Sequence, residues 1–98
     1  MTTGMKTVIR IDWNEYERGW GQRPDGTSLH RTPEIAEEFV KSFWEKNSEE
    51  KAPDEYSAPE TGRIVEVSDA LYERTLAENT IWVSMRRHPS DEDLKSRL

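Results

Sequence analysis

The segment Thr7-Val8-Ile9-Arg10-Ile11-Asp12-Trp13 decides the fold class, because its side chains alternate with a period of two residues. One face carries Ile9, Ile11 and Trp13, and the other carries Val8, Arg10 and Asp12. This alternation predicts a half-buried β-strand. Residues 1–6 before it contain no apolar core of a signal peptide, so we expect the protein to stay where it is made.

The sequence after this strand predicts a hairpin with a long loop. Residues 14–26 contain three glycines and one proline, and they end in the turn sequence Pro24-Asp25-Gly26. A short second strand is expected from Thr27 to Arg31.

An amphipathic helix is expected directly after the hairpin. Thr32 can cap its N-terminus, and Pro33 suits the first helical position. Apolar side chains recur at helical spacing, namely Ile35, Phe39, Val40 and Phe43. The helix should end near Asn47, since asparagine tolerates the left-handed conformation that closes helices.

The second half of the chain predicts a loop, a strand, a helix, another strand and a tail. Residues 48–62 hold two prolines and five acidic residues without apolar periodicity, which indicates a solvated loop that is either functional or mobile. Residues 63–68 alternate as a strand, and Ser68 can cap a helix over 69–78. Residues 80–86 form the last expected strand, and the charged residues from Arg87 onward are expected to fray.

These elements predict an α+β fold in the order β-β-α-β-α-β. We expect one domain over residues 5–87, a flexible charged tail over 88–98, and a mainly antiparallel sheet of about four strands with two helices on one face. The uncovered face would then present Val8, Arg10, Trp82 and Arg86. This set suggests a contact surface, although Trp82 can also lie flat across its sheet neighbours.

Charge and composition exclude several classes of function. The 98-residue chain has a net charge of −6 and no cysteine. Residues 32–62 alone carry three basic against nine acidic side chains. Free nucleic acid is therefore a poor partner and a basic protein surface a better one, while solubility alone also explains the charge. No apolar run approaches the ~20 residues of a membrane span, and we expect a cytoplasmic protein.

The segment between the first two expected strands is the richest candidate binding site. It contains Tyr16, Arg18, Trp20, Gln22 and Arg23 between glycines. Such residues can stack on a planar ligand, clamp an anion or anchor a protein partner. Alternatively, Trp20 folds back onto the sheet edge and closes the core.

Catalytic and metal chemistry have little support in the sequence. His30 and His88 are the only histidines, and neither has a carboxylate at ligand spacing within one element. No nucleophile, base and orienting group can be recognised together, so we expect no catalytic residues, no metal ligands and no cofactor. The acidic loop can imitate a phosphate backbone, but we favour an ordinary solvated linker, because such mimicry needs a rigid array of charges.

Trp20-Gly21-Gln22-Arg23, with Asp25 close behind and Glu34-Ile35-Ala36-Glu37-Glu38-Phe39-Val40-Lys41 after the second strand, resembles small accessory proteins of tailed bacteriophages. Their pattern is Trp-Gly-x-Arg/Lys, an Asp, and a Thr-x-Glu-Glu-Ala-x-x-Phe helix. The resemblance covers residues 6–47, and Pro33-Glu34-Ile35 departs from the usual Glu-Glu. It implies a phage-encoded protein acting in the host cytoplasm rather than a mechanism.

Taken together, the residues and the resemblance predict a non-enzymatic interaction protein that binds and modulates a host or defence protein. The alternative is a small module that binds or sequesters a nucleotide-like anion through Arg18, Trp20 and Arg23. A homo-oligomer is compatible with both, because a domain of this size buries little apolar surface alone.

Overall fold

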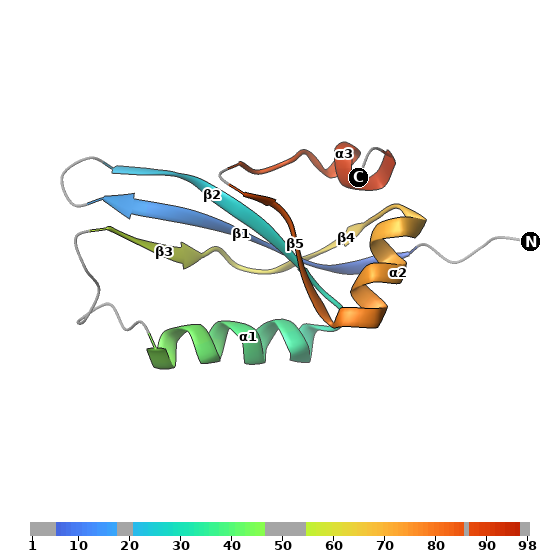
Figure 1. The fold of residues 1–98 in the computed structure, drawn as a ribbon, viewed down its shortest axis with the longest axis horizontal. Helices are drawn as coiled ribbons and strands as arrows, with labels where there is room; N and C mark the ends of the chain where they lie inside the picture. Colours follow the sequence, from blue (N-terminus) through green and yellow to red (C-terminus); the bar gives the residue numbers. More distant parts are fainter. Residues whose placement is uncertain (1–5, 18–20, 47–54, 86, 97–98) are drawn as a thin grey trace, which may run out of the picture.

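The computed structural model describes residues 6–17, 21–46, 55–85 and 87–96 (Figure 1). Its elements are β1 (Thr7–Glu17), β2 (Gly21–His30), α1 (Pro33–Lys46), β3 (Glu55–Pro59), β4 (Arg63–Glu66), α2 (Asp69–Glu78), β5 (Thr80–Met85) and α3 (Asp91–Ser96). All strand pairs between them are antiparallel. The prediction of an α+β domain with an antiparallel sheet is therefore confirmed, with an additional strand and an additional helix.

Strand β1 organises the sheet, because it has partners along both edges. One edge pairs with β2 from Ile9 to Glu17. The other edge pairs with β4 over Thr7–Arg10 and with β3 over Trp13–Glu17. Strand β5 pairs with the far edge of β2. The prediction of a loop over 48–62 is thus wrong for residues 55–59. These residues have no strand-like alternation of apolar side chains, and they form a strand because they pair with β1.

The predicted loop over 14–26 is also wrong, because β1 and β2 continue through most of it. The turn sequence Pro24-Asp25-Gly26 lies next to a register shift between Trp13 and Asn14. Gly26 has a φ of +142°, and a Cβ there would lie 2.9 Å from the Ser84 carbonyl oxygen. The glycine therefore permits a β-bulge and a close strand approach rather than a loop.

Helices cover both faces of the sheet, which corrects the expectation of two helices on one face (Figure 1). Helix α1 packs on Ile9, Ile11 and Trp13 through Ala36, Phe39, Val40 and Phe43. Helices α2 and α3 contribute Leu71 and Leu94 to a second cluster with Val8, Leu29, Val65, Val67 and Ile81. The face expected to be uncovered is consequently buried, with Val8 only 2% and Arg10 only 3% exposed.

The described part of the expected tail is packed rather than frayed. Leu94 of α3 is fully buried, and its carbonyl accepts a hydrogen bond from the Ser68 backbone N–H at 2.8 Å. Ser90 caps α3 by accepting a hydrogen bond from the Asp93 N–H. The docking of α3 could not be predicted from the sequence, because Leu94 is the one apolar residue in α3 and a single residue shows no helical periodicity.

The predicted helix boundaries agree closely with the structure. The Thr32 hydroxyl accepts a hydrogen bond from the Ile35 N–H, and the Ser68 hydroxyl accepts one from the Leu71 N–H. Asn79 ends α2 with a φ of 68°. Caps act within a few residues, so they can be recognised without tertiary structure. Among the residues that the structure describes, no helix is long and apolar enough to cross a membrane.

Candidate functional site

An open apolar hollow lies between α1 and the β2–β5 side of the sheet, and we call it the aromatic groove. Its volume is about 420 Å³. The apolar lining is Trp13, Phe39, Phe43, Trp82 and Met85, and the polar lining is Asp25, Ser42 and Lys46. The groove exists because one helix is too narrow to cover a sheet face of this width.

The aromatic rings of the groove are held in fixed positions by one another. The ring centroid of Trp13 lies 5.8 Å from that of Phe39, 5.0 Å from that of Phe43 and 5.4 Å from that of Trp82. Trp13 is 3% exposed, and its Nε1 donates a hydrogen bond to the Ser28 hydroxyl at 2.8 Å. The floor of the groove is therefore rigid.

Two large apolar side chains beside this floor remain in solvent. Trp82 is 42% exposed and Met85 is 68% exposed. The register places Trp82 opposite Ser28, on the α1 side of the sheet. Trp82 thus belongs to the face opposite the one predicted from sequence, because residues paired across antiparallel strands share a face and Ser28 lies on the side of Trp13.

A second hollow, which we call the distal groove, lies on the other side of α1. It also measures about 420 Å³ and is lined by apolar residues that include Ile9, Ile11, Val40 and Ile64. Ile64 is 69% exposed, but within the described part of the chain no aromatic ring lines this groove. The aromatic groove is the better binding site, since aromatic side chains contribute more contact energy.

His30 is a structural histidine beneath the aromatic groove. It is fully buried and its ring centroid lies 5.0 Å from that of Phe39. Its Nε2 lies 2.9 Å from the Ser28 hydroxyl and its Nδ1 lies 2.9 Å from the Thr80 hydroxyl. Burial lowers the pKa of His30 to about 4, so the ring is neutral at pH 7.

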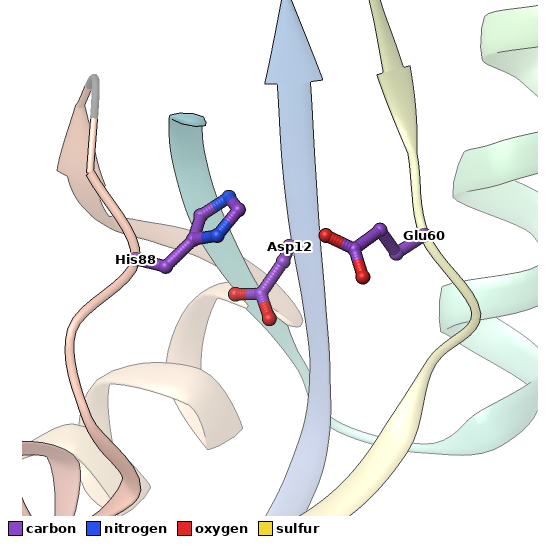
Figure 2. Close-up of side chains that lie close together, drawn as sticks. All are labelled: Asp12, Glu60 and His88. Carbon is purple, nitrogen blue, oxygen red and sulfur yellow. The ribbon is translucent and has the colours of Figure 1, made fainter. Parts of the chain in front are cut away.

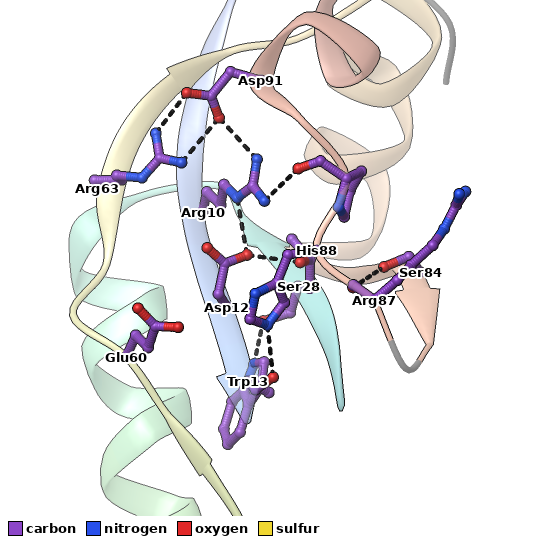
Figure 3. A network of polar contacts seen from close by, with 12 residues as sticks. Arg10, Asp12, Trp13, Ser28, Glu60, Arg63, Ser84, Arg87, His88 and Asp91 are labelled. Atoms are coloured by element: carbon purple, nitrogen blue, oxygen red, sulfur yellow. Dashed lines mark hydrogen bonds and ion pairs between the residues drawn. The ribbon is translucent and has the colours of Figure 1, made fainter. Parts of the chain in front are cut away.

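A polar network ties the C-terminal segment to the sheet on the opposite face (Figure 3). The buried Arg10 donates hydrogen bonds to Asp12, Asp91 and the Pro89 carbonyl. Arg63 donates to both carboxylate oxygens of Asp91 at 2.8 and 3.0 Å. The hydrogen bonds from Arg63 lower the pKa of Asp91 and raise that of Arg63. A buried guanidinium is tolerated here because each of its nitrogens has a partner.

The same region brings together three potential metal ligands that sequence reasoning did not connect. Asp12, Glu60 and His88 each offer a ligand atom, and the three atoms lie within 4.8 Å of one another. They come from β1, from the segment after β3 and from the segment after β5 (Figure 2). No local spacing links positions so far apart in sequence, so only the tertiary fold reveals the cluster.

The sequence-predicted binding residues do not all meet in one place. Tyr16 and Gln22 form a cross-strand pair near the end of the β1–β2 hairpin. Arg23 forms an ion pair with Glu15 at 2.8 Å and lines neither groove. Trp82 lines the aromatic groove. Arg18, Trp20 and Arg86 lie outside the described residues.

Comparison of the chain with known proteins does not assign a function to either groove or to the polar network. The candidate site therefore rests on the aromatic groove, the charge distribution and the polar network described above. No protein-family model, no curated protein and no solved structure matches this chain.

Proposed function

We propose that this is a non-enzymatic interaction protein that binds a protein partner through the aromatic groove. The partner presents an apolar side chain within a basic surface. The observation that carries the proposal is the exposure of Trp82 and Met85 beside a fixed aromatic floor. Trp82 and Met85 line one hollow with Trp13, Phe39 and Phe43, and contiguous apolar surface of this kind, unlike single exposed side chains, marks interaction sites.

The groove has the composition of an interface anchor site. Trp82 contacts Trp13 and Phe39, with centroid distances of 5.4 and 6.2 Å. A partner side chain that enters the groove is desolvated against these rings at little entropic cost, because the rings are already ordered. Tryptophan is also among the residues that dominate interface energies.

The charge around the groove favours a basic partner. The exposed side of α1 carries four glutamates, Glu34, Glu37, Glu38 and Glu45, against two lysines, Lys41 and Lys46, and the whole chain has a net charge of −6. This negative field accelerates association with a positively charged surface and repels nucleic acid. The resemblance to phage accessory proteins supports a host or defence protein as the partner.

The alternative function, binding of a nucleotide-like anion, has weaker support. The groove volume of about 420 Å³ is adequate for a small ligand. However, Arg23 does not line the groove, and among the lining residues that the structure describes Lys46 is the single cation. A thermal-shift panel of nucleotides tests this alternative directly, since ligand binding to the native state raises its stability.

The decisive experiment compares two variants whose substitutions lie in the two different grooves beside α1. The double variant W82A/M85S alters the aromatic groove, and I64S alters the distal groove as a matched control. Wild-type and I64S baits are expected to retain the same bacterial protein in a quantitative pulldown, whereas W82A/M85S loses it. Equal recovery with all three baits, or recovery of bait alone at low and moderate salt, refutes the proposal.

A further inference from the structure

We propose that Asp12, Glu60 and His88 form a binding site for a divalent transition-metal ion, with Zn²⁺ as the favoured ion. The ligand set comprises one imidazole and two carboxylates whose ligand atoms lie within 4.8 Å of one another. His88 and Glu60 approach Asp12 from opposite sides (Figure 2). This site is separate from the aromatic groove and independent of the proposed partner binding.

The hydrogen bond of His88 prepares its ring for metal binding. Its Nε2 lies 2.8 Å from the Trp13 carbonyl oxygen, which can only accept. Nε2 therefore carries the proton, and Nδ1 of the neutral ring keeps a free lone pair. Metal-binding histidines commonly use this arrangement, in which the second nitrogen donates to a carbonyl or carboxylate.

Both carboxylates are oriented by partners that leave one oxygen for the ion. Asp12 Oδ1 accepts from Arg10 Nε at 2.9 Å and from the Thr27 hydroxyl at 2.7 Å. Glu60 Oε2 accepts from Asn14 Nδ2 at 2.6 Å. Within the described part of the chain, no hydrogen bond engages Asp12 Oδ2 or Glu60 Oε1. Such outer contacts hold ligands in position before the ion arrives.

The spacing of the ligand atoms suits an ion after a small closure. For three atoms within 4.8 Å of one another, there is always a point no farther than about 2.8 Å from any of them, where an ion can sit. Zinc bonds to nitrogen and oxygen are about 2.0–2.2 Å long. The Glu60 backbone N–H already donates to the Asp12 carbonyl at 2.8 Å, so rotation of the Glu60 side chain is enough to bring its carboxylate closer without disturbing the sheet.

The local charge also admits a cation. Arg10 and Arg63 contribute two positive charges, while Asp12, Glu60 and Asp91 contribute three negative charges. Apart from His88, these groups sum to one net negative charge. Imidazole favours Zn²⁺ over Mg²⁺ and Ca²⁺, which prefer all-oxygen sites. A bound ion would join β1, the β3–β4 connection and the segment before α3.

The test uses untagged, chelator-treated protein and ZnCl₂ alone. The chain has only two histidines, so imidazole ¹⁵N spectra resolve both rings. Zn²⁺ is expected to shift the Nδ1 resonance of His88, to leave His30 unchanged and to raise the melting temperature. Mg²⁺ at the same concentration should produce neither effect.

Three variants locate the site. H88Q should abolish the zinc-induced rise in melting temperature, and E60Q should weaken zinc affinity at least about tenfold while its amide oxygen still accepts from Asn14. E45Q, an exposed carboxylate on α1 that lines neither groove, is the matched control and should bind as the wild type. An unshifted His88 resonance at millimolar Zn²⁺, or equal zinc affinity in wild type, E60Q and E45Q, overturns the proposal.

Discussion

His30 should make the stability of the protein depend on pH. Its pKa is lowered by burial from 6.5 to about 4 in the folded state. The stabilisation is therefore complete above about pH 6.5 and is lost as the pH falls toward 4. The full effect is up to about 3 kcal/mol, because one pKa unit corresponds to about 1.4 kcal/mol. Urea unfolding at pH 7 and pH 4.5 measures it.

The control for this prediction is H30Q, which removes the titrating group but keeps hydrogen-bonding capacity toward Ser28 and Thr80. Carboxylates titrate in the same window, so the informative quantity is the difference between the two proteins. The loss of stability on acidification should be smaller in H30Q. Identical pH profiles would show that His30 does not control acid stability.

Gly26 should resist substitution because of its backbone and its neighbour. Its φ of +142° is strained for any other residue, and an added Cβ would meet the Ser84 carbonyl oxygen at 2.9 Å. We expect G26A to destabilise the protein by about 1–3 kcal/mol. Gly21 also has a positive φ of +89°, but a Cβ there has no atom within 4 Å. In thermal unfolding, G21A should therefore lower the melting temperature less than G26A. The reverse order would contradict the close approach of Gly26 to Ser84 at the β-bulge.

At the scale of the elements, α3 should contribute strongly to stability although it has only six residues. Leu94 is fully buried in the cluster with Leu71 and Val65. We expect L94A to lower the free energy of unfolding by about 2–5 kcal/mol, as other buried leucines do. K95A, one residue further on and exposed, serves as the control and should change it little. Chemical denaturation that found L94A and K95A equally stable would mean that α3 is not docked in solution.

Among the helices and strands, those that depend on nearby residues could be predicted from the sequence, and those that depend on distant residues could not. Helices α1 and α2 were predictable because Thr32, Ser68 and Asn79 form caps with residues three or four positions away. Strand β3 was not, because Glu55–Pro59 becomes a strand through its antiparallel pairing with Glu17–Trp13. Long-range pairing leaves no periodic signal in a short polar segment.

At the scale of the whole molecule, the two clusters share one sheet and should unfold together. Val8 and Ile9 are neighbours in β1 but belong to opposite clusters. Loss of either cluster exposes one face of β1, and the other cluster packs on the opposite face of the same strand. We therefore expect a single cooperative unfolding transition. L71A alters the α2 face, yet it should lower the midpoints of tryptophan fluorescence and far-UV circular dichroism equally. A fluorescence midpoint that stays unchanged while the dichroism midpoint falls would contradict this coupling.

The aromatic groove is likewise a property of the whole molecule. Trp13, Phe39 and Trp82 come from β1, α1 and β5, and the sequence assigned Trp82 to the opposite face. The register of β5 against β2 determines on which face of the sheet Trp82 lies. A shift of the register by one residue moves each side chain of a strand to the other face. The prediction that Trp82 is exposed rested on an uncovered sheet face, but α2 and α3 cover that face, and Trp82 is exposed on the α1 side instead.

The α+β class, both long helices with their caps, the strand at residues 7–13 and the acidic surface could all be predicted from the amino-acid sequence. These features depend on alternation, on helical spacing and on contacts within a few residues. Three other features became visible in the folded chain alone: both faces of the sheet are covered, Leu94 is buried, and Asp12, Glu60 and His88 converge. They follow from strand register and long-range packing, which join residues with no local relation in the chain.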